Sequence, residues 1–144
     1  MTVRCIPLVS LLVASAIGST SAFAAEGIVV IGHSSVPTLD TETVNRIFTH
    51  RIVVVKGVFV TAVNASKGDV VRARFLRNFL GQSDDQYTAY MLSRQSVGLG
   101  KPPQELVSRI DVINFVSSTP GAIGYIEETD IRPGMNIVLK TPLR

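Results

Sequence analysis

The sequence predicts an α/β fold, and three features of the chain support this prediction. Residues 28–31 form a continuous β-branched run, which is typical of a strand buried on both faces. Residues 122–126 are short, apolar and β-prone, and they follow directly on Pro120 and Gly121, a pair that favours a tight turn. Helical patterns occupy much of the chain between these segments. Strands that alternate with helices form layered α/β domains.

Residues 1–24 have the pattern of a cleaved secretory signal. One basic residue, Arg4, precedes an apolar run at residues 6–17, and Ala22 and Ala24 place small side chains at the two positions that a signal peptidase reads. The apolar run is too short for a transmembrane helix. We expect cleavage after Ala24, which leaves residues 25–144 as a single periplasmic domain.

The exported part of the chain offers no catalytic or metal-binding pattern. Without Arg4 it has 13 Lys and Arg against 11 Asp and Glu, and this net charge of +2 is too weak to favour nucleic acid as a partner. The single cysteine, Cys5, lies in the signal, so the exported part has no thiol. Neither His33 nor His50 has the neighbours that a closed metal site requires. No phosphate-binding loop or nucleophile elbow occurs. We expect a protein that is not an enzyme and holds no metal or cofactor.

Several of the expected elements have a local signal at one of their ends. Asp40 has the position of a helix N-cap, Gly57 marks a turn between two extended segments, and Gly81 ends a helix. Residues 98–103 contain two glycines and two prolines and separate two helices. In chain order, the expected elements are a strand at 28–31, a helix at 41–48, extended segments at 52–55 and 58–63, helices at 69–80, 84–97 and 104–117, and strands at 122–126 and 137–139.

The predicted helix at 69–80 contains one residue that its apolar pattern does not explain. Arg74 and Arg77 fall on the side expected to be solvated, but Arg72 projects from the middle of the apolar face, where a guanidinium is disfavoured unless it is paired. Three arrangements remain open: an ion pair with Asp69 one turn earlier, exposure past the helix start, or contact with an anion in a cleft. The residues of the apolar face are Val71, Phe75, Leu76, Phe79 and Leu80.

Two loops carry polar groups that suit a ligand. Ser34 and Ser35 follow the first strand, and loops at strand ends in α/β folds often hold ligands, although a solvated connection is the simpler interpretation. The loop at 64–69 leads into the helix that carries Arg72, and the N-terminal amides of a helix favour anions.

The order of motifs along residues 27–130 resembles that of the short phosphate ABC transporter substrate-binding-like proteins, which are relatives of the type 2 periplasmic phosphate-binding proteins. The block at 120–125, Pro-Gly-Ala-Ile-Gly-Tyr, is fairly specific for this family. The other matching pieces are weaker one by one, and their order adds weight: Leu39-Asp40, Ile47-Phe48, Lys56-Gly57, Arg72 with Phe75, Ala89-Tyr90 and residues 98–103.

This resemblance implies a single lobe of a type 2 periplasmic-binding-protein-like fold, with a mixed sheet flanked by helices. It also implies an exported protein that binds phosphate or a related oxyanion through loop amides and hydroxyls, for an ABC permease or a membrane sensor. The candidate ligand-binding residues are Ser34, Ser35, Asn64, Ser66, Lys67, Gly68 and Arg72.

The sequence departs from the family pattern at several positions. A valine replaces the hydroxyl residue nearest the arginine, and Asp69 adds a negative charge beside the expected anion. His50 stands where relatives usually have glycine, and Met91 where they often have tryptophan. Full-length members hold the ligand between two lobes, whereas residues 25–144 supply about one. A second interpretation therefore stays open: a single-lobe interaction module that keeps the fold and has lost the ligand.

Overall fold

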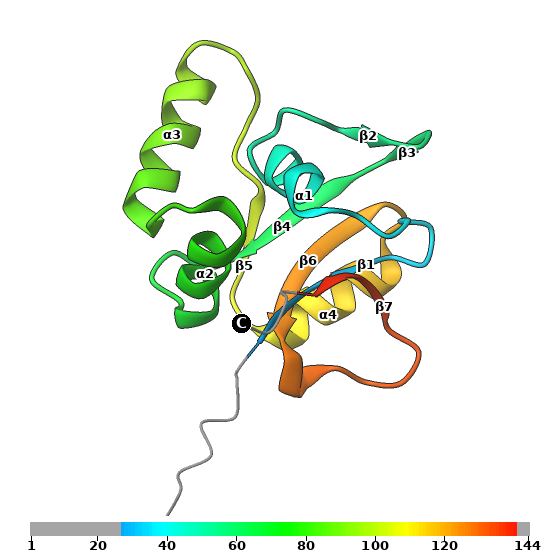
Figure 1. Ribbon diagram of the computed structural model, residues 1–144. Helices are drawn as coiled ribbons and strands as arrows, with labels where there is room; N and C mark the ends of the chain where they lie inside the picture. Colours follow the sequence, from blue (N-terminus) through cyan, green and yellow to red (C-terminus); the bar gives the residue numbers. More distant parts are fainter. Residues whose placement is uncertain (1–26, 141–144) are drawn as a thin grey trace, which may run out of the picture.

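A five-stranded mixed sheet lies at the centre of the protein, with helices on both of its faces (Figure 1). This computed structural model describes residues 27–140. In the strand order β5-β4-β6-β1-β7, β4 runs parallel to β5 and β6, whereas β1 runs antiparallel to β6 and β7. The predicted α/β class with a mixed sheet is confirmed. The strands of this sheet are β1 (Ile28–Gly32), β4 (Thr61–Ala65), β5 (Gln104–Leu106), β6 (Ala122–Glu127) and β7 (Asn136–Lys140).

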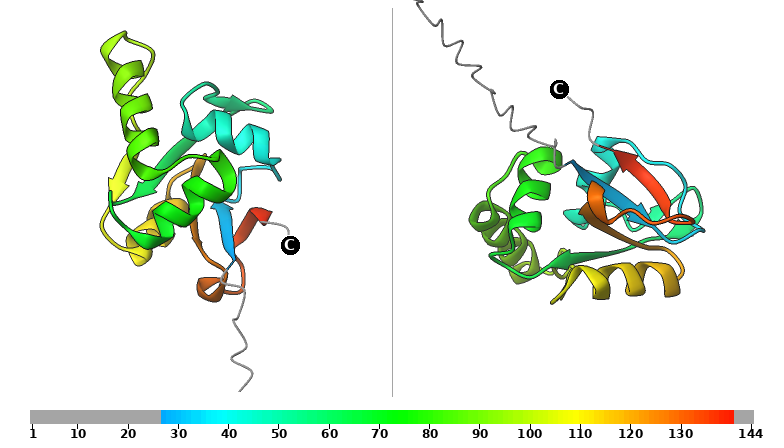
Figure 2. Two further views of the ribbon diagram at one scale, coloured as in Figure 1. Left: turned by 60° about the vertical axis from the view of Figure 1, so that its left-hand side comes forward. Right: turned by 90° about the horizontal axis from the view of Figure 1, so that it is seen from below.

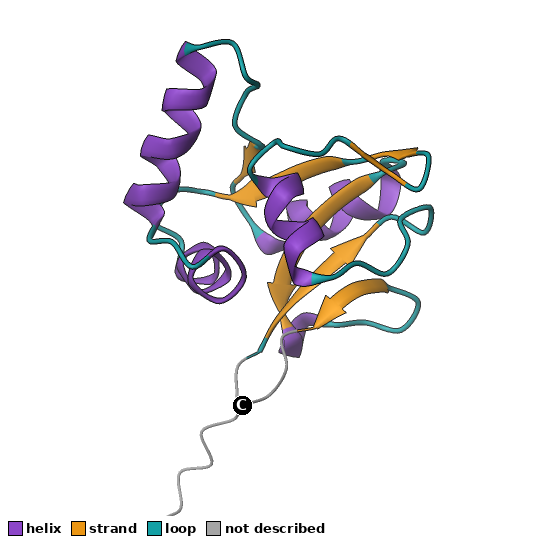
Figure 3. Cartoon of the chain, turned by 45° about the horizontal axis from the view of Figure 1, so that its top comes forward, coloured by secondary structure: helices purple, strands orange, loops and turns teal. Residues whose placement is uncertain are grey.

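The helices form two outer layers. Seen from below, α4 covers one face of the sheet, and α1 and α2 lie on the other (Figure 2). α3 extends beyond the edge of the sheet at which β5 lies (Figure 3). The helical segments are α1 (Thr41–Phe48), α2 (Val70–Phe75), the π-helical turn η1 (Leu76–Leu80), α3 (Asp84–Ser96), α4 (Arg109–Ser118) and the 3-10 turn η2 (Glu128–Asp130).

Burial explains the apolar composition of strand β1, because both of its faces are covered. Ile28 and Val30 belong to the apolar cluster on the side of α1 and α2, whereas Val29 and Ile31 belong to the cluster on the side of α4. A central strand buried in this way has no polar face, which is why its apolar run is uninterrupted.

The predicted turn at Gly57 joins two strands, but the second extended segment, expected at 58–63, divides into two strands. β2 (Val54–Val55) and β3 (Val58–Phe59) pair antiparallel across the turn at Lys56 and Gly57. The chain then enters β4, which leaves the hairpin and joins the main sheet. The expected single segment at 58–63 therefore serves two different sheets.

The predicted helix at 104–117 is wrong at its start. Gln104–Leu106 is strand β5, which pairs parallel with β4, and the helix begins only after the N-cap Ser108. Ile110, an apolar residue of the predicted helix, is 54% exposed. The apolar periodicity of the sequence did not separate this strand from the helix, because pairing with a strand far away in the chain leaves no local signal. The buried residues of α4 are Val112, Ile113 and Val116.

Two further expectations about single residues have clear outcomes. Arg74, expected to be solvated, instead forms an ion pair with Glu127 on β6 at 2.9 Å. His50 has a φ of 56°, a left-handed conformation that favours glycine, which explains why glycine is usual here in the family that the sequence resembles.

The expected signal, residues 1–24, lies outside the described residues. Within residues 27–140, no helix is both long enough and apolar enough to cross a membrane.

Candidate anion-binding site

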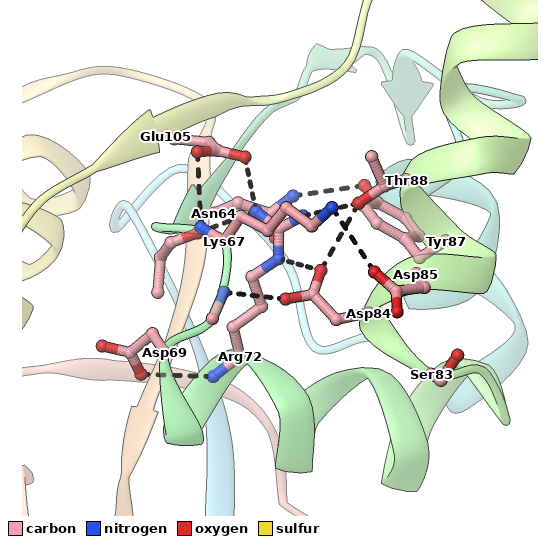
Figure 4. A network of polar contacts seen from close by, with 12 residues as sticks. Asn64, Lys67, Asp69, Arg72, Ser83, Asp84, Asp85, Tyr87, Thr88 and Glu105 are labelled. Atoms are coloured by element: carbon pink, nitrogen blue, oxygen red, sulfur yellow. Dashed lines mark hydrogen bonds and ion pairs between the residues drawn. The ribbon is translucent and has the colours of Figure 1, made fainter.

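The side chain of Arg72 lies at the centre of a polar cluster beyond the carboxyl end of β4 (Figure 4). Only 3% of this side chain is exposed, so its charge needs partners within the protein. Asp84, in the first turn of α3, and Glu105, on β5, supply the negative charges. The cluster therefore ties together α2, α3 and β5, three elements that are separate in the sequence.

Arg72 donates hydrogen bonds to two carboxylates and one backbone carbonyl. Its Nε lies 2.9 Å from Asp84 Oδ1, and its Nη1 lies 2.6 Å from Glu105 Oε1 and 3.0 Å from the carbonyl oxygen of Ala65. Among the described residues, the polar contact of Nη2 is a long one, 3.4 Å to the Thr88 hydroxyl. Neither carboxylate therefore takes two parallel N–H groups of the guanidinium, which is the strongest arrangement for such a pair.

The same two carboxylates also accept hydrogen bonds from the loop after β4. The backbone N–H of Gly68 donates to Asp84 Oδ2 at 2.9 Å, and that of Lys67 donates to Glu105 Oε2 at 3.4 Å. Each carboxylate thus bridges the guanidinium and one loop amide. The N–H groups that we expected to bind an oxyanion therefore bind carboxylate oxygens of the chain itself.

The structure shows which of the three arrangements left open by the sequence Arg72 adopts. Arg72 is paired internally, but not with Asp69. The Asp69 carboxylate caps α2, since its Oδ1 accepts hydrogen bonds from the backbone N–H groups of Val71 at 2.7 Å and of Arg72 at 3.4 Å. The amides expected to bind an anion at the start of this helix are therefore already used by Asp69.

The electrostatics of the cluster keep Arg72 charged. Burial by itself lowers the pKa of the guanidinium, because it disfavours the charged form. The hydrogen bond to Glu105 and the charges of Asp84 and Glu105 outweigh burial, so the pKa of Arg72 is raised overall.

Asn64 belongs to a buried polar network behind the cluster. Its Nδ2 donates to the Tyr87 hydroxyl at 3.2 Å, and its Oδ1 accepts from the Tyr125 hydroxyl at 3.1 Å. The Tyr87 hydroxyl in turn donates to the carbonyl of Phe48 at 2.7 Å. Burial raises the pKa of Tyr87 to about 12 and also raises the pKa of Tyr125. This network fixes the end of β4 from which the loop departs.

Ser66 and Lys67 lie at the cluster, but their side chains have other partners. The Ser66 hydroxyl donates to the carbonyl of Leu106 at 3.3 Å. Lys67 Nζ lies 3.4 Å from Asp85 Oδ1, in a pair whose side chains are 53% and 91% exposed. Ion pairs as exposed as this one contribute little to stability.

The structure does not bring Ser34 and Ser35 to the same place. β1 and β4 run in opposite directions along β6, so the loop after β1 and the loop after β4 lie at opposite ends of the sheet. The Ser35 hydroxyl accepts a hydrogen bond from the backbone N–H of Gly121 at 3.1 Å. The seven predicted residues therefore form one group around Arg72 and a separate pair.

Two residues of the cluster were missed from the sequence. Asp84 has the ordinary position of an acidic residue in the first turn of a helix, which the helix dipole favours. Glu105 lies within a segment predicted to be helical. The misplaced charge of Arg72 was the only signal that acidic partners exist, and it does not identify them.

Solved structures of phosphate transport proteins share this fold. An ABC-type phosphate transport receptor from Vibrio cholerae superimposes with a TM-score of 0.61 at 15% identity, over 78% of this chain and 45% of the receptor. A phosphate ABC transporter substrate-binding protein from Clostridium perfringens, with bound phosphate, gives 0.61 at 20% identity over 78% and 44%. The protein has the fold of a phosphate-receptor lobe. PstS from Borrelia burgdorferi agrees, with a TM-score of 0.57 at 16% identity over 78% and 46%.

These comparisons confirm the predicted resemblance at the level of the fold. The chain spans less than half the length of each of the three proteins. No protein-family model matches the sequence, and no curated protein matches it. In the part of the chain that the structure describes, no three His, Cys, Asp or Glu side chains are grouped as a metal ion would require.

Proposed function

We propose that this receptor-like lobe is an exported, non-catalytic binding protein that holds a small oxyanion, phosphate or one of similar size. The observation that carries the proposal is the convergence of the Arg72 guanidinium and the N–H groups of Lys67 and Gly68 on carboxylate oxygens. Donors in this arrangement also suit the oxygens of a free anion. The fold shared with phosphate transport proteins, one of them with bound phosphate, supports the proposal.

The proposed cellular setting follows from the secretory pattern of residues 1–24. An exported binding protein without catalytic residues acts through a partner. We therefore assign it an ABC-type permease or a membrane sensor, to which the lobe delivers the anion or reports its presence.

A second candidate function is a single-lobe interaction module that binds no ligand. The observation in its favour is that Asp84 and Glu105 already neutralise Arg72, so an incoming anion has to displace one of them.

Calorimetry of the purified protein with phosphate, sulfate and acetate tests the proposal. We expect heat with at least one of these anions, together with NMR shifts of the Lys67 and Gly68 amides. Arg72→Lys keeps the charge but loses the planar fork, and should weaken binding, whereas Arg77→Lys at an exposed position should not. Heat with none of the anions would favour the interaction module.

A further inference from the structure

We infer that Glu105 is an exchangeable occupant of this site, and that the site prefers a small, singly charged carboxylate over a dianion. An anion binds by displacing Glu105 from Arg72, while Asp84 stays in place. This inference rests on the proposed function and specifies the class of its ligand.

The two carboxylates on Arg72 are held to different degrees. The Asp84 side chain is 16% exposed and its bond to the Gly68 amide is 2.9 Å long. It also sits directly after Ser83, whose capping box fixes the first turn of α3. The Glu105 side chain is 48% exposed, lies on a three-residue strand at the edge of the sheet, and its contact with the Lys67 amide is 3.4 Å long. The Glu105 contact with Arg72 is the shorter of the two, 2.6 Å against 2.9 Å, but Glu105 gives up less burial and a weaker loop contact when it turns into solvent.

A cavity of about 170 Å³ is lined by Arg72 and Glu105. Pockets for drug-sized ligands measure about 300–1,000 Å³, so this one limits the ligand to a few heavy atoms. Asn64, Tyr87 and Thr88 add further polar residues to the lining. The remaining lining includes carbon-rich side chains, which suit a short hydrocarbon chain: Met91, Leu92, Pro102 and Pro103.

The guanidinium offers a displacing carboxylate one better hydrogen bond than Glu105 makes. Glu105 takes only Nη1 of Arg72, and Nη2 has the 3.4 Å contact with Thr88. A free carboxylate is not tied to a strand, so it can take Nη1 and Nη2 together as a planar fork. This gain offsets part of the cost of releasing Glu105.

The surrounding charges select a single negative charge. Exchanging Glu105 for a monoanion leaves the total charge beside Arg72 unchanged. A dianion would add one further negative charge beside Asp84, and like charges repel one another, whereas Asp85 is already paired with Lys67. Short-chain carboxylates match the charge, the fork and the carbon-rich wall. Sulfate can also take the fork, but it carries two negative charges and has no hydrocarbon part.

Titration of the purified protein with propionate and with sulfate, at matched ionic strength, tests the inference. We expect parent protein to bind propionate more tightly than sulfate. Glu105→Ala removes the internal competitor and should bind propionate about tenfold more tightly than the parent, as expected when a charged hydrogen-bonding competitor is removed. Glu42→Ala removes a glutamate side chain on α1 that is 75% exposed and should leave propionate binding unchanged.

Each outcome separates this inference from the proposed function. Sulfate binding as tight as propionate binding would overturn the preference for a single charge, and an unaltered affinity in Glu105→Ala would overturn the role of Glu105, but either result keeps an anion site. Binding of neither anion by parent or variant, together with no binding of phosphate, would overturn both the inference and the proposed function. If Glu105→Ala does not fold, propionate added to the parent should still shift the Lys67 amide and the Glu105 side-chain carboxyl signal in NMR spectra, and unshifted signals would refute the displacement.

Discussion

Arg72 is buried, yet its partners come from two elements that lie far from it in the sequence. Taking charges out of water is expensive, so a buried ion pair adds little net stability, but removing one of its members leaves the other uncompensated. Arg72 holds Asp84 and Glu105 as well as the Ala65 carbonyl. Its removal therefore affects both the fold and the site.

Arg72→Ala should lower the free energy of unfolding by about 3 kcal/mol, because Asp84 loses its counter-charge in a largely buried position. Urea unfolding followed by circular dichroism measures this change. Arg77→Ala, at an exposed position of η1, should stay within about 0.5 kcal/mol of the parent. An unchanged midpoint for Arg72→Ala would mean that the acidic side chains are well solvated without it.

The raised pKa of Tyr87 predicts that the protein loses stability in alkaline solution. Burial raises its pKa from 10.0 to about 12, so the folded protein keeps this proton at a pH at which the unfolded chain loses it. Tyr87 thereby contributes about 2–3 kcal/mol to the free energy of unfolding. This contribution is complete below about pH 10 and is lost as the pH rises to about 12. Unfolding curves between these pH values measure the decline.

Tyr87→Phe should make this alkaline decline shallower, although the variant is less stable at neutral pH because it loses the bond to the Phe48 carbonyl. Tyr90→Phe, at a hydroxyl bound to Arg51 near the surface, should keep the decline. An equal slope in Tyr87→Phe and the parent would contradict the assignment to Tyr87.

At the scale of elements, the close contact of β6 with α4 depends on Gly124. A Cβ atom at this position would lie 2.8 Å from Val112 Cγ1 and 3.2 Å from Val116 Cγ2, both on α4, and 3.2 Å from Val63 Cγ2 on β4. A glycine within an apolar strand predicts a bulge or the close approach of another backbone. The groups that approach Gly124 are instead side chains of two neighbouring elements.

Gly124→Val should therefore destabilise the protein by about 1–3 kcal/mol, as overpacking typically does. A thermal melt checks this, with Thr61→Val as a control that adds an apolar group at an exposed strand position. Gly124→Ala should fall between Gly124→Val and the parent. A melting temperature of Gly124→Val equal to that of the parent would show that α4 moves away at little cost.

At the scale of the whole molecule, the protein combines an N-terminal export pattern with a lobe that spans less than half of each phosphate transport protein it resembles. The polar cluster lies where α3 and β5 meet the loop after β4, so its donors all come from this one lobe. The anion site that we propose therefore does not require a second lobe to assemble its donors.

The secretory pattern predicts that protein recovered from the periplasm begins at Ala25, because Ala22 and Ala24 suit a signal peptidase. The intact mass of the purified protein decides this. Replacing Ala24 by a bulky residue should slow the processing. Membrane-bound material that retains its N-terminus would contradict the prediction.

The sequence by itself determined the elements whose signals are local. The uninterrupted apolar run of β1, the Asp40 cap of α1, the helix end at Gly81 and the turn at Gly121 are each carried by neighbouring residues, and each was predicted in place. Only the tertiary structure decided which strand β5 joins and which acidic residues neutralise Arg72. Those choices depend on pairings between residues far apart in the chain, and charge or hydrophobicity alone does not specify the partner. The sequence placed Arg72 on an apolar face and left three arrangements open for it, and the fold decided for pairing with Asp84 and Glu105.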